Sequence, residues 1–187
     1  MIVSIGDSII YGYPHRRGQS FTGLLREQYG YDIINKGVNG DTCEGVLARF
    51  EKDALSKNPE MILLHIGTND FIEGKGPDYV LSKVMEMVNM AGENKVVVLT
   101  PILTYPELAS KRWIAADYSS INMNMEIYAG MLAGAGIPYI DTQAFAAEYA
   151  KDKHMESVYV DGIHPGVTVH KAIAEYIDKV LKGDFND

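Results

Sequence analysis

The chain has 187 residues, of which 47% are hydrophobic and 22% are charged, and this composition is typical of a single globular domain with a full core. Its 25 acidic residues outnumber its 17 basic ones to give a net charge of −8, and the basic residues form only short clusters, so we expect no nucleic-acid partner. The one cysteine, Cys43, excludes an internal disulfide and is expected to be a buried apolar residue.

Short apolar runs alternate along the chain with longer segments of helical periodicity. In chain order the pattern predicts a strand at 2–5, a helix at 20–29, a strand at 32–35, a helix at 42–57, a strand at 61–66, a helix at 77–92, a strand at 96–100, a helix at 114–134, a strand at 139–141 and a helix at 170–181. Most of the strands are continuously apolar, as expected for parallel strands that helices cover on both faces. The sequence therefore predicts an α/β fold, a three-layer doubly wound sandwich with a five-stranded parallel sheet, as one domain spanning residues 1–187.

Two observations bear on the location of the protein. No run approaches the roughly 20 apolar residues that a membrane-spanning helix needs, so we expect no membrane span. No basic leader or cleavable apolar segment precedes the first strand, so we expect a cytoplasmic protein.

The stretch from Pro101 to Trp113 shows no regular pattern. It is too long for an ordinary connection, and long loops commonly carry function. We expect it to be irregular and to overhang the sheet.

Polar residues and glycines gather where the predicted strands end. In an open parallel sheet, ligands bind outside these carboxyl ends. The segments concerned are Gly6-Asp7-Ser8, Asn35 to Thr42, Gly67-Thr68-Asn69-Asp70, and Asp161-Gly162-Ile163-His164-Pro165 ahead of the last helix. We expect them to lie along one rim of the sheet.

Several familiar motifs are missing from this rim. No Gly-x-Gly-x-x-Gly and no Gly-x-x-x-x-Gly-Lys-[Ser/Thr] follows a strand, which leaves a phosphate-binding loop of either type unsupported. The Gly-x-Ser-x-Gly elbow is also absent, because Ile10 stands two residues after Ser8. The residues present do match the needs of acyl transfer, which requires a nucleophile, a base, a carboxylate that orients the base, and donors for an oxyanion.

The four segments resemble the four blocks of the SGNH (GDSL) hydrolase family, in the family's order from residue 6 to residue 165. The resemblance implies the SGNH hydrolase fold, which is flavodoxin-like, and hydrolysis of a carboxylic ester or thioester without a metal or an organic cofactor. It implies that Ser8 is the nucleophile, that His164 and Asp161 complete a triad, and that Gly40 N–H, Asn69 NH₂ and Ser8 N–H form the oxyanion hole. The spacing of Asp161 and His164 suits these roles, because a carboxylate three residues before a histidine in one turn can hold the ring N–H.

The resemblance also implies a small-molecule substrate, since the family includes lysophospholipases, thioesterases, arylesterases and sugar O-deacetylases. Apolar side chains near the rim are candidates for an acyl-binding trough. They are Ile9, Ile10, Tyr11, Phe71, Ile72, Leu103, Tyr105, Trp113 and Ile163. The first block continues with Ile9 where the family name has leucine, which affects the expected trough and leaves the serine in place.

Other readings of the same residues remain open. A metal-dependent phosphoesterase could use Asp7, Asn69, Asp70 and His164, and a binding module for a glycan or lipid could retain the scaffold without turnover. Ser8 could cap the helix that follows it, and Asn39 or Asp41 could cap the helix near Thr42.

The remaining acids and histidines are given structural roles. We expect Asp7 and Asp70 to brace loops through backbone amides. We expect His65 to be a satisfied core or rim histidine, and His15, His154 and His170 to lie in loops or on helix surfaces.

Overall fold

The computed structural model describes residues 1–113 and 116–183, and its centre is a parallel sheet. The five strands are β1 (Ile2–Gly6), β2 (Ile33–Gly37), β3 (Met61–His65), β4 (Lys95–Leu99) and β5 (Tyr139–Ile140). They are hydrogen-bonded in the order β2-β1-β3-β4-β5, and every pairing is parallel. The predicted α/β class and the five parallel strands are confirmed.

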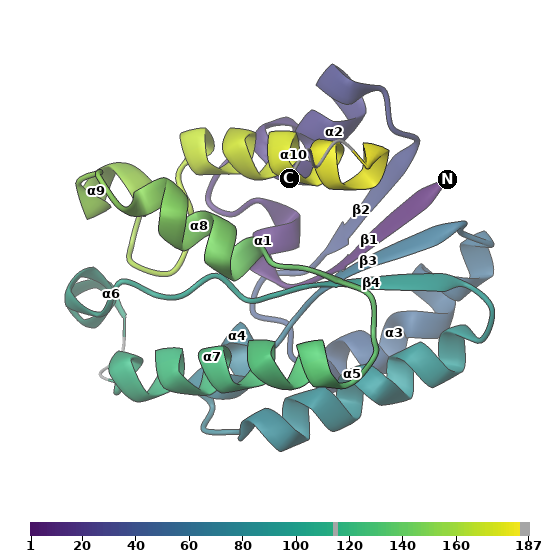
Figure 1. Cartoon of the computed structure of the whole chain (residues 1–187), viewed down its shortest axis with the longest axis horizontal. Helices are drawn as coiled ribbons and strands as arrows, with labels where there is room; N and C mark the ends of the chain where they lie inside the picture. The colour runs from purple at the N-terminus through teal and green to yellow at the C-terminus, as the bar shows by residue number, and fades with distance from the viewer. Residues whose placement is uncertain (114–115, 184–187) are drawn as a thin grey trace.

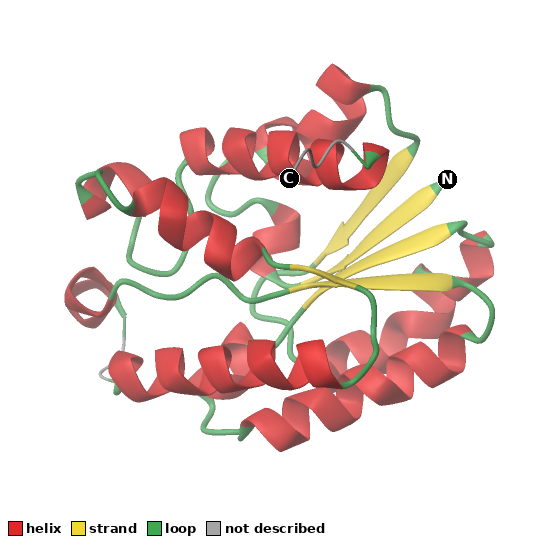
Figure 2. Cartoon of the chain, viewed as in Figure 1, coloured by secondary structure: helices red, strands yellow, loops and turns green. Residues whose placement is uncertain are grey.

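Helices cover both faces of the sheet (Figures 1 and 2). On one side lie α1 (Ser8–Tyr11), α2 (Phe21–Tyr29), α8 (Thr142–Ala150) and α10 (Val167–Lys182), with α9 (Met155–Val158) at their end. On the other side lie α3 (Cys43–Asp53), α4 (Thr68–Ile72), α5 (Pro77–Ala91) and α7 (Tyr118–Gly134). The helix α6 (Pro106–Arg112) lies beyond the carboxyl ends of the strands. The arrangement is the predicted three-layer sandwich.

The apolar side chains of the strands divide between two cores because successive side chains point to opposite faces. In β3, Ile62 and Leu64 belong to the core under α3, α5 and α7, whereas Leu63 belongs to the core under α2 and α10. In β4, Val96 and Val98 share the first core, and Val97 and Leu99 share the second. This two-sided burial explains why the strand sequences are continuously apolar.

Three predicted helices have shifted ends. The helix predicted at 42–57 is α3 to Asp53 followed by a 3₁₀ turn at Leu55–Lys57. The helix predicted at 114–134 begins at Tyr118, and residues 114 and 115 lie outside the described residues. The last helix, predicted at 170–181, begins earlier, at Val167.

The prediction for the segment from Pro101 to Trp113 was wrong in one respect. Most of its second half is the helix α6, which begins with Pro106 in its first turn and has Lys111 and Arg112 in its last turn. Proline suits the first turn of a helix because the N–H groups there have no acceptor within the helix, so the N–H that proline lacks is not missed. Cations suit the last turn because their charge is attracted to the negative end of the helix dipole.

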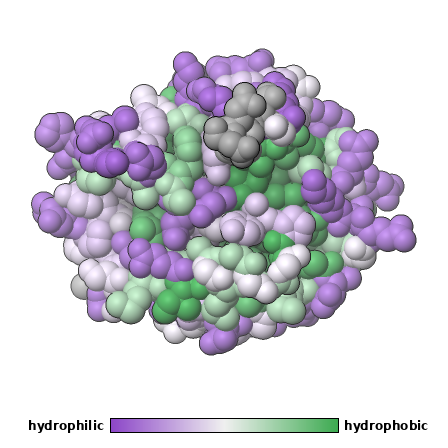
Figure 3. Space-filling model, in the orientation of Figure 1, coloured by the Kyte–Doolittle hydropathy of each residue, from purple (hydrophilic) through white to green (hydrophobic). Residues whose placement is uncertain are grey.

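The surface follows from this layering. Hydrophilic residues make up most of the outline of the face in Figure 3, and hydrophobic ones reach it in patches. Over the residues described, the structure has no helix that is both long enough and apolar enough to cross a membrane.

Candidate active site

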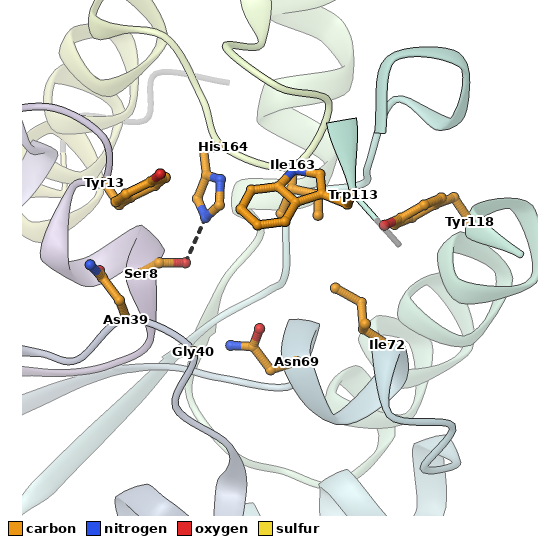
Figure 4. Close-up of a pocket in the computed structure, with 10 residues that line it drawn as sticks. All are labelled: Ser8, Tyr13, Asn39, Gly40, Asn69, Ile72, Trp113, Tyr118, Ile163 and His164. Atoms are coloured by element: carbon orange, nitrogen blue, oxygen red, sulfur yellow. Dashed lines mark hydrogen bonds between the residues drawn. The ribbon is translucent and has the colours of Figure 1, made fainter. Parts of the chain in front are cut away.

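The loops at the carboxyl ends of β1, β2 and β3 and the turn before α10 surround one cavity of about 470 Å³ (Figure 4). The described residues that line it are Ser8, Tyr13, Asn39, Gly40, Asn69, Ile72, Trp113, Tyr118, Ile163 and His164. Four segments that are far apart in the sequence therefore contribute to one site, at the carboxyl ends of the strands as predicted.

Ser8 is the first residue of α1, the short helix that follows β1. The residue that caps this helix is Asp7, whose side chain accepts a hydrogen bond of 2.9 Å from Ile9 N–H. Asp7 thus braces the loop as predicted, and the alternative in which Ser8 is the cap is wrong. The same carboxylate lies 3.1 Å from Nδ1 of His65, and both side chains are only 1% exposed.

A continuous chain of hydrogen bonds joins Ser8, His164 and Asp161. Ser8 Oγ lies 2.9 Å from His164 Nε2, and His164 Nδ1 lies 2.7 Å from Asp161 Oδ2. An ionised carboxylate can only accept, so Nδ1 carries the proton and Nε2 is left as the acceptor for the Ser8 hydroxyl. All three residues are buried, at 7%, 6% and 8% exposure respectively.

The turn that carries His164 also fixes Asp161. Asp161 Oδ1 accepts hydrogen bonds from the backbone N–H groups of Ile163, at 3.0 Å, and of His164, at 2.8 Å. Burial alone would raise the pKa of Asp161, but the hydrogen bonds from the His164 ring and from these amides outweigh it, so the pKa is lowered. The carboxylate therefore stays ionised beside the ring.

Two aromatic rings flank the imidazole of His164 (Figure 4). Tyr13 meets it edge-on with ring centroids 4.7 Å apart, and Trp113 lies at 5.8 Å in a tilted arrangement. Aromatic pairs of this geometry are favourable contacts, and here they restrict rotation of the imidazole.

Gly40 and Asn69 lie together on the side of the cavity opposite His164 (Figure 4). Gly40 has a φ of 75°, in the left-handed region that favours glycine. Among the described residues, none accepts a hydrogen bond from Gly40 N–H. Asn69 donates from Nδ2 to the carbonyl oxygen of Asp41 at 2.8 Å, which leaves its second N–H available.

The helix after this loop is capped by Thr42, whose hydroxyl accepts from Gly45 N–H. The alternative in which Asn39 or Asp41 is the cap is therefore wrong. Asp70 accepts a hydrogen bond from the N–H of Cys43, which is the bracing role predicted for it, and Cys43 is buried as expected.

Several side chains predicted to line an acyl trough lie elsewhere. Of that set, Trp113, Ile163 and Ile72 line the cavity. Ile9, Ile10 and Phe71 are buried in the two cores, Tyr11 is half-buried beneath the Arg17 guanidinium, and Leu103 and Tyr105 line a separate hollow of about 220 Å³ beside α8. Ile9 and Ile10 point into the core because α1 packs against β1 and β2, and Phe71 points into the other core because α4 packs against α7.

Sequence reasoning missed three residues that line the cavity, namely Tyr13, Asn39 and Tyr118. Tyr13 follows the end of α1 at Gly12, and Tyr118 is the first residue of α7. A helix boundary at either point would have indicated that these side chains face the rim.

The prediction for His170 was wrong. It is fully buried on α10, where it accepts a hydrogen bond from Phe21 N–H at 3.3 Å. Burial, reinforced by the neighbouring histidines His15, His164 and His65, lowers the pKa of His170 to about 3. His65 is buried as expected, but it is not fully satisfied, because its Nε2 has no hydrogen-bond partner among the described residues.

The ligands needed by the metal alternative do not come together. Asp7 and Asp70 are each bonded to backbone amides, of Ile9 and Cys43. Over the described part of the chain, no group of three or more histidine, cysteine, aspartate or glutamate residues is placed to hold a metal ion.

Comparison with known proteins agrees with the geometry. The model of the GDSL-like lipase/acylhydrolase family matches residues 4–172. An arylesterase from Vibrio mimicus is 26% identical over 185 residues, which cover 96% of this chain and 87% of the relative. The esterase TesA of Pseudomonas aeruginosa is 25% identical and covers 97% of this chain and 87% of the relative.

A solved structure extends the likeness to the fold. It is that of a member of the lipolytic protein G-D-S-L family from Veillonella parvula, with a TM-score of 0.80, 19% identity and 97% of each chain covered. The family match extends over all four segments that surround the cavity. The chain therefore belongs to the GDSL-like lipase/acylhydrolase family and is a carboxylic ester hydrolase.

Proposed function

We propose that the protein cleaves its ester through an acyl-enzyme intermediate on Ser8. The observation that carries the proposal is the hydrogen-bonded chain at the cavity, with Ser8 Oγ 2.9 Å from His164 Nε2 and His164 Nδ1 2.7 Å from Asp161. A nucleophile, a base and a group that orients the base are in contact in the order that nucleophilic catalysis requires.

Acylation begins when Ser8 Oγ attacks the carbonyl carbon of the ester. His164 Nε2 takes the proton of the hydroxyl, and the ionised Asp161 stabilises the imidazolium that forms. Collapse of the tetrahedral intermediate breaks the bond to the alcohol oxygen, which receives the proton back from His164. The alcohol leaves and the acyl group remains on Ser8.

The negative charge on the tetrahedral intermediate needs donors that are in place before the reaction. Gly40 N–H, the second N–H of Asn69 and Ser8 N–H fill this role in our proposal. Ser8 is the first residue of α1, a position whose N–H has no acceptor within the helix. The three donors belong to residues that line one cavity.

Deacylation uses the same residues in reverse. A water molecule takes the place of the alcohol, His164 removes its proton, and the hydroxide attacks the acyl carbon. The proton returns to Ser8 Oγ as the carboxylic acid is released. No cofactor takes part in this cycle.

The cavity has two sides that suit the two parts of an ester. Because His164 must protonate the leaving oxygen, the alcohol lies on the imidazole side. That side borders a second hollow of about 330 Å³, lined by Tyr13, Pro14, Arg112, Trp113, Val160 and Asp161. The acyl group then lies on the side of Ile72 and Tyr118, beyond Asn69, where Ile72 offers an apolar contact and Tyr118 turns its hydroxyl towards the cavity (Figure 4).

The proposal is tested by steady-state hydrolysis of p-nitrophenyl acetate. We expect Ser8→Ala and His164→Ala to reduce kcat to the background rate, since losing either residue of a serine protease triad costs on the order of 10⁶-fold. Ser82→Ala, which changes an exposed serine on α5, serves as the matched control and should retain full activity.

The same assay separates the alternatives. Ser8→Ala activity within tenfold of the wild type would overturn the proposal. Loss of wild-type activity in EDTA would favour the metal-dependent reading, and a wild-type protein that binds esters without cleaving any would favour the silent binding module.

A further inference from the structure

Arg49 on α3 makes an unusually complete set of hydrogen bonds without touching the cavity. Its Nε and Nη2 lie 2.8 Å and 2.7 Å from Asp41 Oδ2. Its Nη1 donates to the carbonyl oxygen of Lys36 at 2.9 Å and to Asp53 at 3.1 Å, and its Nη2 donates to the carbonyl oxygen of Gly6 at 3.0 Å. One guanidinium group therefore joins the end of β1, the end of β2 and the loop that follows β2.

The loop that Arg49 holds carries Gly40, one donor of the proposed oxyanion hole, and contacts Asn69 of α4, a second donor. Asp41 directly follows Gly40, and its carboxylate is fixed by Arg49 while its other oxygen accepts from Thr42 N–H. The carbonyl oxygen of Asp41 accepts the hydrogen bond from Asn69 Nδ2. The position of Asp41 thus fixes the orientation of the neighbouring Gly40 peptide group and of the Asn69 side-chain amide.

The contact with Gly6 extends the same support to the nucleophile. Gly6 lies two residues before Ser8, at the last position of β1. Figure 4 shows the amide nitrogen of Asn69 turned towards the side on which Gly40 and Ser8 lie. The Arg49 side chain therefore supports, through Asp41 and Gly6, the segments that carry Gly40, Asn69 and Ser8.

Burial makes this brace rigid. The side chains of Arg49 and Asp41 are only 18% and 10% exposed, so solvent screens their ion pair weakly. Arg49 projects from α3, which the buried Val46 and Phe50 anchor in the core. Arginine suits the position because its planar fork can serve a carboxylate and two carbonyl oxygens together, whereas a lysine offers one ammonium group.

We propose that Arg49 is a positioning residue that pre-organises the oxyanion hole through Asp41. The inference rests on the proposed function, because it assumes that Gly40 and Asn69 stabilise an oxyanion. Arg49 itself contacts no substrate. Its effect is to hold the donors where charge develops, and a displacement of about 1 Å at such a site can cost on the order of 10²-fold in rate.

The test compares Arg49→Met and Arg49→Lys with a matched control, Asp53→Asn. Asp53 is the partner of Arg49 that lies on α3 itself, away from the Gly40 loop. We measure kcat and KM for p-nitrophenyl acetate, the inhibition constant of an alkyl boronic acid, and the melting temperature. A boronic acid forms a tetrahedral anionic adduct with the active serine and so reports on the oxyanion hole separately from substrate binding.

We expect both Arg49 variants to lower kcat, Arg49→Met by about 10²-fold, with KM changed by less than threefold. The boronic acid should lose affinity by a similar factor. Asp53→Asn should keep kcat within twofold of the wild type even if its melting temperature falls. A role limited to stability would instead lower the melting temperature of all three variants and leave kcat intact in each.

The outcomes separate this inference from the proposed function. Wild-type kcat and boronic acid affinity in a folded Arg49→Met or Arg49→Lys protein would overturn the role of Arg49 alone. If Arg49→Met does not fold, Arg49→Lys decides the question by the same two measurements. A Ser8→Ala protein that keeps its activity would remove the proposed function and this inference together.

Discussion

Asp161 accepts hydrogen bonds at both of its carboxylate oxygens, and this explains how a buried turn can hold an imidazole in one tautomer. One oxygen faces His164 Nδ1 at 2.7 Å, and the other accepts from two backbone amides. The same interactions lower the pKa of Asp161, so the carboxylate remains charged below the usual range of about 4 for aspartate. As the pH falls through this lowered pKa, Asp161 is protonated and its stabilising contribution to the folded protein is lost.

Substitution of Asp161 by asparagine tests this arrangement. The amide oxygen can still accept from the backbone, but its NH₂ group would face the ring and place the imidazole proton on Nε2, towards Ser8. We expect kcat for p-nitrophenyl acetate to fall by about 10⁴-fold, as for the same change in a serine protease. Asp152→Asn, at an exposed position, is the control. An Asp161→Asn enzyme within tenfold of the wild type would show that His164 does not depend on this carboxylate.

At the residue scale, the sequence predicts polar positions better than apolar ones. Ser8, Gly40, Asn69 and His164 line the cavity, as predicted. Their positions could be predicted because each residue lies in a short sequence motif at the end of a strand or ahead of a helix. Apolar residues beside these motifs are ambiguous, since Ile9 and Phe71 fill the core just as readily as they could line a trough. Only the direction of a side chain from its helix decides between the two, and that direction depends on tertiary packing.

At the scale of elements, α6 supports the turn that carries the proposed base. Gly162, with a φ of 90°, lies against α6 so closely that a Cβ would come within 2.2 Å of Ala109 N. Its carbonyl oxygen accepts a hydrogen bond of 2.7 Å from Tyr105 N–H. Part of a segment predicted to be irregular is thus a helix, and its N-cap Tyr105 and its residue Ala109 support the turn that carries His164.

The helices that sequence reasoning missed are short or lack a single apolar face. Residues 142–150 of α8 include alanines and aromatic residues on several sides, so no stripe of helical period stands out. Asp141 was predicted to end a strand, but its side chain caps α8 by accepting from Ala144 N–H. Helices with one apolar face, such as α2 and α5, were predicted within a residue or two.

His170 couples α10 to α2 and makes stability depend on pH. Its pKa is about 3 in the folded protein, because of burial, against about 6.5 for an unfolded histidine. Between these two pKa values the histidine is protonated in the unfolded chain and neutral in the folded protein. The contribution of neutral His170 to the stability of the fold is therefore complete above the unfolded pKa and declines as the pH falls. We expect this residue to lower the free energy of unfolding by about 2 kcal/mol between pH 7.5 and pH 5.

Urea unfolding of His170→Asn at the two pH values measures this contribution. The asparagine oxygen can still accept from Phe21 N–H but does not titrate, so the variant should lose about 2 kcal/mol less than the wild type over this interval. His154→Asn removes an exposed histidine and should behave like the wild type. Equal pH dependence in His170→Asn and the wild type would contradict the assignment.

At the scale of the whole molecule, the strand order explains why distant segments meet. β1 lies between β2 and β3, so the loops that carry Ser8, Gly40 and Asn69 are neighbours along one edge of the sheet. The turn before α10 brings His164 to Ser8 across 156 residues of sequence. Periodicity in the sequence predicts the layers, and the rule that ligands bind at the carboxyl ends of parallel strands predicts the edge. The contact between Arg49 and the loop that carries Gly40 could not be predicted, because it depends on side-chain geometry between α3 and three backbone segments.

Covalent labelling with a fluorophosphonate, mapped by mass spectrometry of the digested protein, tests the central claim most directly. The account predicts one adduct, on the peptide that contains Ser8, which is lost in Ser8→Ala and forms much more slowly in His164→Ala. A catalytically active wild-type protein that stays unlabelled, or that carries the adduct on another residue, would contradict it.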